Sequence, residues 1–351
     1  MSSAMSSAMR RTTNTPVARR LTAAAVALGS CLALAGPAGS ADAAPADPVP
    51  TVFFGDSYTA NYGIAPWHQD GDRFLCFQAE ENYPTVATRR LADKGLTLDV
   101  QSDVSCGGAL SHHFWEEQEL LPGSGLRVPP QQEALKADTQ LAVGSMGGNT
   151  LGFTRILKQC SDKLRSPEHA LLPGEPVDPD EPAATCREFF ESGDGKQWLD
   201  DQFERVGWDL EEMLERIRYF SPDAQPVLVG YPRLVPEDTT KCLTPAPGQT
   251  ELPLADIPQD ALPFLDQIQK RLDDTAKKAV ADAGADFVDL YAHTGSNTAC
   301  DGVNRGIGGL LENSQIDIGG QKLLWYAHPN ERGRDIQSER VADKVEQVLN
   351  R

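Results

Sequence analysis

Short apolar segments alternate with longer segments of helical periodicity along most of the chain. Runs rich in apolar and β-branched residues predict strands at 51–54, 96–104, 139–143, 226–231 and 287–291. Between and after them, apolar residues recur at three- and four-residue spacing, which predicts helices over 83–94, 198–220, 264–283 and 335–349. Strands separated by helices are typical of a parallel sheet covered on both faces. The sequence therefore predicts an α/β protein, a three-layer α/β/α sandwich with a central parallel sheet of about five strands.

The first 43 residues have the pattern of a secretory signal peptide. A basic head precedes an apolar run over 21–36, which is too short to span a bilayer, and Ala41-Asp42-Ala43 fits a small-residue cleavage site. We therefore expect residues 1–43 to be removed and residues 44–351 to form a single secreted, extracellular domain with no stable membrane anchor. The pair Arg19-Arg20 leaves twin-arginine export open beside the general secretory route.

The charge balance is strongly acidic. The whole chain has a net charge of −19, and the signal carries four of its 32 basic and one of its 51 acidic residues, which leaves −22 on the rest. Such a surface argues against nucleic acid and anionic membranes as partners. We expect the exported protein to be a monomer.

Cysteine usage agrees with export. Cys31 lies in the signal, and six cysteines remain: Cys76, Cys106, Cys160, Cys186, Cys242 and Cys300. An even number in an exported chain favours three disulfides, although the sequence alone leaves their pairing open. No two cysteines have zinc-ligand spacing and no His-x-x-x-His occurs, so we expect neither a metal site nor a cofactor.

Polar and glycine-rich motifs follow the first three predicted strands. Ser57 comes after the first, Gly107-Gly108 after the second, and Gly147-Gly148-Asn149 after the third. Because ligands bind at the carboxyl ends of parallel strands, these motifs are expected at one edge of the sheet. A serine becomes a good nucleophile only when a base takes its proton, and His328, ahead of the last helix, is the candidate base.

Each of these residues also has a structural interpretation. Gly107-Gly108 could form only a tight turn, and Asn149 could cap a helix that starts near Leu151. Asp56 is expected to brace its turn rather than to act chemically. His112 and His113 adjoin the Gly108 segment and are the main rivals of His328 as the base.

Taken together, the motifs resemble the blocks of the SGNH (GDSL-type) hydrolases, and the resemblance extends over residues 44–351. Four blocks occur in the family's order: Gly55-Asp56-Ser57-Tyr58, Ser105-Cys106-Gly107-Gly108, Gly147-Gly148-Asn149 and His328-Pro329. The resemblance implies that Ser57 is the nucleophile and His328 the general base. It also implies an oxyanion hole formed by the backbone N–H groups of Ser57 and Gly108 and the side-chain amide of Asn149. It further implies the disulfides Cys76–Cys106, Cys160–Cys186 and Cys242–Cys300.

One position departs from the family pattern. Family members usually carry an aspartate three residues before the histidine, where this chain has Trp325. An indole cannot accept a hydrogen bond from an imidazole N–H. A closer resemblance, to a member that uses the main-chain carbonyl at this tryptophan, implies a Ser-His dyad oriented by the Trp325 carbonyl. Asp317 and Asp335 are the nearest acids in sequence and remain rivals for that role.

These features lead us to expect a carboxylic ester hydrolase that acts through an acyl-serine intermediate. Activity should rise with pH as His328 loses its proton, so a profile flat from pH 5 to 8 would count against a histidine base. A lipase or acyltransferase with the same residues is the alternative. A non-catalytic binding module is a second alternative, but its mark, the loss of the serine or of an oxyanion donor, is missing here.

Overall fold

A five-stranded parallel sheet forms the centre of the computed structural model, which describes residues 47–120, 123–169, 172 and 174–351. The strand order is β2-β1-β5-β6-β7, and every neighbouring pair is parallel. The strands are β1 (Val49–Gly55), β2 (Leu98–Asp103), β5 (Leu141–Ser145), β6 (Gln225–Val229) and β7 (Asp286–Val288). The predicted fold class is thereby confirmed. The predicted signal over 1–43 lies outside the described residues.

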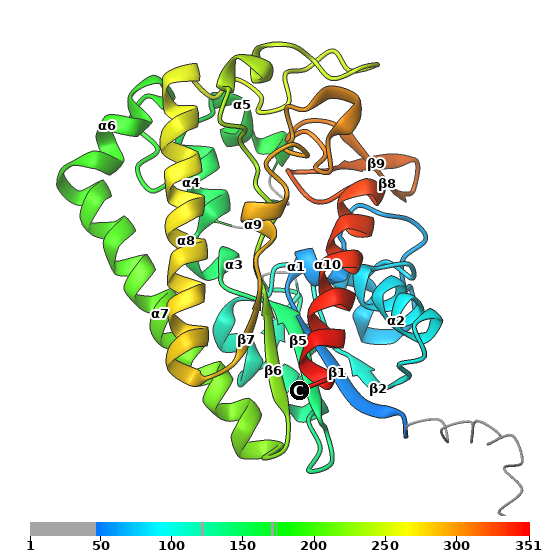
Figure 1. The fold of residues 1–351 in the computed structure, drawn as a ribbon. Coiled ribbons are helices and arrows are strands. Elements are labelled where there is room, and N and C mark those ends of the chain that lie inside the picture. Colours follow the sequence, from blue (N-terminus) through cyan, green and yellow to red (C-terminus); the bar gives the residue numbers. More distant parts are fainter. Residues whose placement is uncertain (1–46, 121–122, 170–171, 173) are drawn as a thin grey trace, which may run out of the picture. The chain divides into compact units, whose positions relative to one another are not determined.

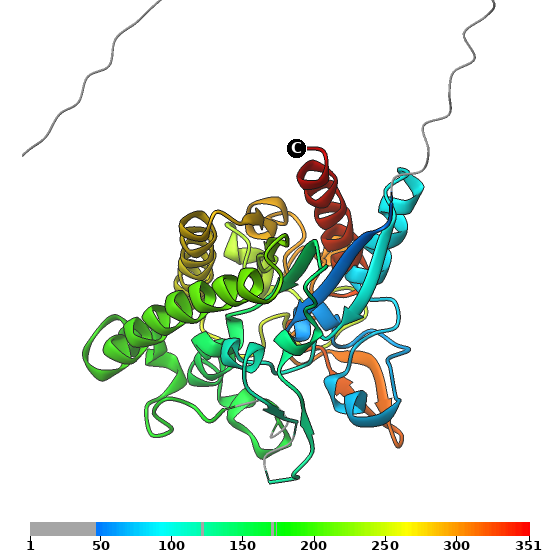
Figure 2. The same ribbon diagram turned by 90° about the horizontal axis from the view of Figure 1, so that it is seen from below.

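Helices cover both faces of this sheet (Figure 1). On one side lie α7 (Gly193–Phe220) and α8 (Leu262–Ala283), and on the other α2 (Tyr83–Asp93) and α10 (Glu331–Leu349). The view from below shows the same two layers on either side of the strands (Figure 2).

The alternation of side chains along β1 explains why both faces need a cover. Val52 and Phe54 are buried in the cluster formed with α7 and α8, whereas Phe53 points to the other face and packs with α2 and α10. Successive residues of a strand point to opposite faces, so an all-apolar strand is stable only when both faces are covered.

Several shorter elements lie around the sheet edges. The short helices are α1 (Ser57–Ala60), α3 (Gly148–Leu151), α4 (Phe153–Gln159), α5 (Asp162–Arg165), α6 (Cys186–Glu191) and α9 (Leu290–His293). Two small antiparallel pairs join β3 (Gln118–Glu119) to β4 (Arg127–Val128) and β8 (Asn313–Ile318) to β9 (Gln321–Leu324). No helix of the described residues is long and apolar enough to cross a membrane.

The structure moves some predicted boundaries. The strand predicted over 287–291 ends at Val288, because the Asp289 side chain accepts a hydrogen bond from Ala292 N and starts helix α9. The helix predicted from residue 198 begins at Gly193. The last helix begins at Glu331, where the Asn330 side chain caps it by accepting from Gly333 N.

Three disulfides join the six cysteines. The pairs are Cys76–Cys106, Cys160–Cys186 and Cys242–Cys300, which are the pairs that the resemblance implies. Each links segments outside the sheet strands, so the cross-links hold the connecting loops rather than the central sheet.

Candidate active site

Ser57 stands at the first position of α1, directly after β1. The turn between them passes through Gly55, whose φ of +136° is open mainly to glycine. A Cβ at Gly55 would lie 2.2 Å from Thr59 Oγ1 and 2.7 Å from the Ser145 carbonyl oxygen. Asp56 then caps the helix by accepting a hydrogen bond from Tyr58 N at 2.9 Å. This tight turn presents the Ser57 hydroxyl at the carboxyl edge of the sheet.

His328 meets Ser57 across 271 positions of sequence. Its Nε2 lies 2.7 Å from Ser57 Oγ, and its Nδ1 lies 2.9 Å from the carbonyl oxygen of Trp325. A carbonyl can only accept, so Nδ1 carries the proton and Nε2 presents a lone pair to the Ser57 hydroxyl. This tautomer can receive a proton from Ser57.

The segment that carries His328 turns sharply. Tyr326 and Ala327 have φ values of +48° and +63°, and His328 N donates to the Trp325 carbonyl at 3.0 Å. Positive φ at both central residues is the mark of a type I′ turn, and it is costly for residues other than glycine. The Trp325 carbonyl therefore accepts from both the backbone and the ring of His328.

The Trp325 ring fills a slot between two glycines. A Cβ on Gly63 would lie 2.4 Å from the ring, and one on Gly308 would lie 2.2 Å from Trp325 Cγ. The side chain is buried and packs with Ile64 and Ala79. These contacts fix the ring and, through it, the position of the carbonyl that His328 meets.

Aromatic rings surround the His328 imidazole. Tyr58 and Tyr62 lie 4.9 Å and 4.8 Å from it between ring centroids. The Tyr58 hydroxyl donates to the Ala327 carbonyl at 2.9 Å, which ties helix α1 to the histidine turn. Burial lowers the pKa of His328 from 6.5 to about 4, although the hydrogen bonds to the Trp325 and Tyr326 backbone act in the opposite direction.

Asn149 lies in the first turn of α3, after β5, where it does not cap the helix. The cap position is Gly147, and the Asn149 side chain donates instead to the Ala109 carbonyl at 3.0 Å. This bond holds the amide beside Gly108. Within the described part of the chain, the backbone N–H groups of Ser57 and Gly108 donate to no protein acceptor. They are therefore available to a substrate oxygen.

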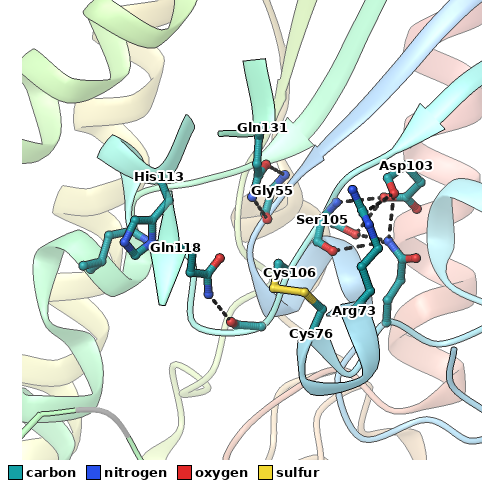
Figure 3. The surroundings of a disulfide bond; sticks show 12 residues. Gly55, Arg73, Cys76, Asp103, Ser105, Cys106, His113, Gln118 and Gln131 are labelled. Carbon is teal, nitrogen blue, oxygen red and sulfur yellow. Dashed lines mark hydrogen bonds between the residues drawn. A yellow bond between two sulfur atoms is a disulfide. The ribbon is translucent and has the colours of Figure 1, made fainter. Parts of the chain in front are cut away.

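The segment before and around Gly108 is held on several sides (Figure 3). The Cys76–Cys106 disulfide anchors it, and Gly107 N donates to the Cys76 carbonyl at 2.9 Å. Gln118 Nε2 donates to the Gly107 carbonyl at 2.7 Å. Beside it, the Gln131 amide pairs with the backbone of Gly55, at 2.7 Å to N and 2.9 Å to O.

Sequence reasoning missed Tyr231, which follows β6 and also supports the turn before Ser57. Its hydroxyl donates to Asp56 Oδ2 at 2.5 Å and accepts from Gly148 N at 2.8 Å. It thereby links the turn before Ser57 to the helix that carries Asn149. Asp56 is fully buried, and this burial raises its pKa from 3.8 to about 7. The signal in the sequence was the position of Tyr231 at the carboxyl end of a strand.

The residues considered from the sequence as alternative bases or orienting acids bond to other groups. Asp335 pairs with Arg334, and the exposed Asp317 accepts from Gly320 N in the β8–β9 turn. His113 Nδ1 accepts from the backbone N–H of Leu110 at 3.0 Å. None of the three bonds to His328 or to Ser57 in the described residues.

Two cavities open around these groups. One, of about 50 Å³, is lined by Ser57 and His328 together with Asn149, Phe153, Leu157, Tyr231 and Tyr326 among others. The second, of about 370 Å³, is lined by Gly108 and also by Asn149. Asn149 therefore separates them. No group of three or more metal-ligating side chains occurs in the residues that the structure covers.

Comparison with known proteins identifies relatives along most of the chain. Residues 53–336 match the model of the GDSL-like lipase/acylhydrolase family. An esterase of Streptomyces scabiei is 78% identical over 348 residues, which cover 99% of this chain and all of that protein. Lipase 2 of Streptomyces coelicolor is 31% identical over 293 residues, 82% of this chain and 85% of that one.

Solved structures share the fold at low identity. Phospholipase A1 from Streptomyces albidoflavus superposes with a TM-score of 0.57 at 17% identity, over 85% of this chain and 99% of that one. An extracellular lipase from Streptomyces rimosus gives 0.55 at 16% identity, over 84% and 99%. These likenesses establish the architecture alone.

Proposed function

The chain belongs to the GDSL-like lipase/acylhydrolase family and is an ester hydrolase, and on that premise we propose a Ser57–His328 dyad that works through an acyl-serine intermediate. The single observation that carries the proposal is the 2.7 Å contact between His328 Nε2 and Ser57 Oγ. This is hydrogen-bond distance, which a nucleophile and its base require.

The proposed reaction has two halves. Ser57 Oγ attacks the ester carbonyl carbon while His328 Nε2 takes the hydroxyl proton, and the carbonyl oxygen becomes negative. The backbone N–H groups of Ser57 and Gly108 and the Asn149 amide would donate to that oxygen. His328 then returns the proton to the departing alcohol, which leaves an acyl-serine. In the second half, water attacks the acyl carbonyl carbon while His328 Nε2 takes one of its protons. His328 then returns this proton to Ser57 Oγ as the acyl–oxygen bond breaks and the acid leaves.

The orienting group in this proposal is a neutral carbonyl rather than a carboxylate. The 2.9 Å contact from His328 Nδ1 to the Trp325 carbonyl supports it, and neither Asp317 nor Asp335 bonds to the ring. A carbonyl fixes the tautomer of His328. It stabilises the imidazolium less than a carboxylate would, because hydrogen bonds to charged acceptors are about twice as strong.

We also propose that the enzyme is secreted as a single domain of residues 44–351 after removal of residues 1–43. The apolar run behind a basic head supports export. Three disulfides support an oxidising destination, because reduced thiols prevail in the cytosol.

A set of substitutions tests the dyad. Ser57→Ala and His328→Ala should lower kcat for p-nitrophenyl acetate by several orders of magnitude, because each removes a reacting group. Only variants with Ser57 should bind a fluorophosphonate probe covalently. Asp317→Asn and Asp335→Asn should keep nearly full activity, since neither acid takes part.

Trp325→Ala tests the role of the main-chain carbonyl more directly. It keeps the main-chain carbonyl but removes the ring that positions it, so hydrolysis in the folded fraction should fall far less than in Ser57→Ala or His328→Ala. Its free energy of unfolding should fall by about 3–5 kcal/mol, since a buried ring is lost. Loss of turnover in well-folded Asp335→Asn, or probe labelling of a residue other than Ser57, would refute the proposed site.

A further inference from the structure

The larger cavity beside the oxyanion donors has cationic side chains in its lining. It measures about 370 Å³ and shares Asn149 and Thr154 with the cavity of Ser57 and His328. A substrate whose carbonyl oxygen lies against Gly108 and Asn149 would extend one of its arms into this space. The lining of this cavity therefore influences which acyl or alcohol parts of an ester the enzyme accepts.

Two arginines line this cavity in a strongly acidic protein. Arg155 comes from α4 and Arg205 from α7, with His112 beside them, and no Asp or Glu is among the lining residues. The whole chain has a net charge of −19. The lining of this cavity therefore differs in charge from the rest of the protein, because it contains arginines and no acidic residue.

The guanidinium groups have unused donors. Arg155 Nε donates to the Glu175 carbonyl at 2.9 Å, and the group stacks on Trp198 at 5.3 Å from the ring centroid. Neither Nη atom of Arg155 has a hydrogen-bond acceptor among the described residues. Among the same residues, Arg205 makes no hydrogen bond and no ion pair. The Nε atom and the plane of the Arg155 guanidinium are thus held in place, while its two Nη atoms remain available to a ligand.

One carboxylate lies close but does not neutralise the pair. Asp209, one turn beyond Arg205 on α7, is not among the lining residues and forms no ion pair in the described chain. Burial raises its pKa, while Arg205 and His112 act to lower it. Arg205 therefore has no ion-pair partner among the described residues, although its charge acts on the Asp209 carboxyl.

We propose that this cavity is a subsite for an anionic group, a carboxylate or a phosphate, carried by one arm of the ester substrate. Arginine suits this role, because its fork of N–H donors matches both oxyanions in bidentate fashion. The inference rests on the proposed function, since the arm enters the subsite only when the ester carbonyl reaches Ser57. The enzyme would then prefer charged esters over neutral esters of the same length.

Matched substrate pairs test this preference. The mono-p-nitrophenyl ester of adipic acid is compared with p-nitrophenyl hexanoate, and 1-hexanoylglycerol 3-phosphate with 1-hexanoylglycerol. We expect kcat/KM to be about tenfold higher for the charged member of at least one pair, as for a hydrogen bond to a charged group. A preference in the first pair identifies a carboxylate on the acyl part of the ester, and one in the second a phosphate on the alcohol part. Higher ionic strength should reduce it.

Variants locate the effect. Arg205→Gln and Arg155→Gln should remove most of the preference, because they lower kcat/KM for the charged esters far more than for the neutral esters. Arg155→Lys should restore part of it. Arg89→Gln, at an exposed arginine of α2 paired with Glu81, is the control and should change nothing.

Equal rates for charged and neutral esters, or a preference that survives both glutamine substitutions, would overturn the subsite. That result would leave the proposed function intact, because hydrolysis of the neutral esters and its loss in Ser57→Ala are measured in the same series.

Discussion

At the scale of single residues, the imidazole of His328, the proposed base, has an electrostatic setting unlike that of a serine hydrolase triad. The partner of His328 Nδ1 is a neutral carbonyl. Tyr58, Tyr62 and Tyr326 lie near the imidazole and add no negative charge. Burial therefore dominates, and it lowers the pKa of His328 to about 4. A carboxylate in the orienting position would act in the opposite direction.

This setting changes the expected pH dependence. Only neutral His328 can accept the Ser57 proton, so kcat/KM should rise as pH increases through about 4 and then stay flat to pH 8. The sequence led us to expect a rise between pH 5 and 8, which assumed an ordinary imidazole. A rise centred on pH 6.5 to 7 in a profile of kcat/KM from pH 3 to 8, if it persists in Asp56→Asn, would contradict the burial effect on His328.

Two controls accompany that profile. Circular dichroism at each pH shows that the fold persists. Asp56→Asn separates the second perturbed group, because Asp56 has a pKa of about 7. An inflection near pH 7 that disappears in this variant belongs to Asp56 and not to the base.

Motif reasoning found Ser57 and His328, because both lie in short blocks of characteristic residues. It could not find Tyr231, whose partners Asp56 and Gly148 lie 175 and 83 positions away. Nor could it find the Trp325 slot, which depends on two separate glycines. Such contacts arise from packing between elements, and one sequence carries no record of which residues meet.

At the scale of elements, a turn rather than a helix or strand positions the proposed base, His328. His328 follows β9 through two residues of positive φ, and the Trp325 ring between Gly63 and Gly308 anchors the start of that turn. The element is short, so its geometry is set by packing around it.

Adding one methyl group to the slot should disturb catalysis. In Gly308→Ala the new Cβ would lie 2.2 Å from Trp325 Cγ, so the ring and its carbonyl must shift. We expect kcat to fall about 10- to 100-fold, as for a small misplacement of a catalytic group. Ser57 should still react with a fluorophosphonate, but more slowly.

The matched control is Gly207→Ala in α7. There the new Cβ meets only Thr275 Cγ2, at 3.7 Å, which is ordinary contact. Activity should be unchanged, and the free energy of unfolding should rise by about 0.5–1 kcal/mol, because alanine replaces glycine within a helix. Equal activity of Gly308→Ala and wild type would show that the slot does not position the carbonyl.

The order and type of the main elements were predictable, because strand and helix periodicities are strong in this chain. The small β8–β9 hairpin was not predicted, although it precedes the histidine turn. Its residues include Asp317, Gly319 and Gly320 and lack a clean alternation of apolar side chains. Tertiary contacts hold it, with Ile316 and Leu323 packed on Trp67.

At the scale of the whole molecule, distant segments are joined by covalent and polar links. The disulfides enclose loops with sequence separations of 26 to 58 residues. The first and last parts of the domain meet at Ser57 and His328 and again where Asn61 Nδ2 donates to Gln337 Oε1 at 2.8 Å. The site lies where these links converge.

Removing single disulfides should separate stability from catalysis. Cys76→Ser/Cys106→Ser and Cys242→Ser/Cys300→Ser should each lower the free energy of unfolding by about 4 kcal/mol, given separations of 30 and 58 residues. Only the first pair should also lower kcat, because it releases the segment of Gly107 and Gly108. Urea unfolding and steady-state kinetics measure the two effects.

The second double variant serves as the control, since Cys242 and Cys300 join loops that carry neither the proposed dyad nor the proposed oxyanion donors. Equal kcat losses in both variants would mean that general loosening, and not the Gly108 segment, limits turnover.

The distance in sequence between nucleophile and base also has a consequence for biosynthesis. A growing polypeptide carries Ser57 from an early stage, yet it lacks a base until position 328 has left the ribosome and the histidine turn has packed against α1. The proposed dyad therefore cannot form in a nascent chain that still lacks His328. Hydrolysis by this dyad requires the completed fold.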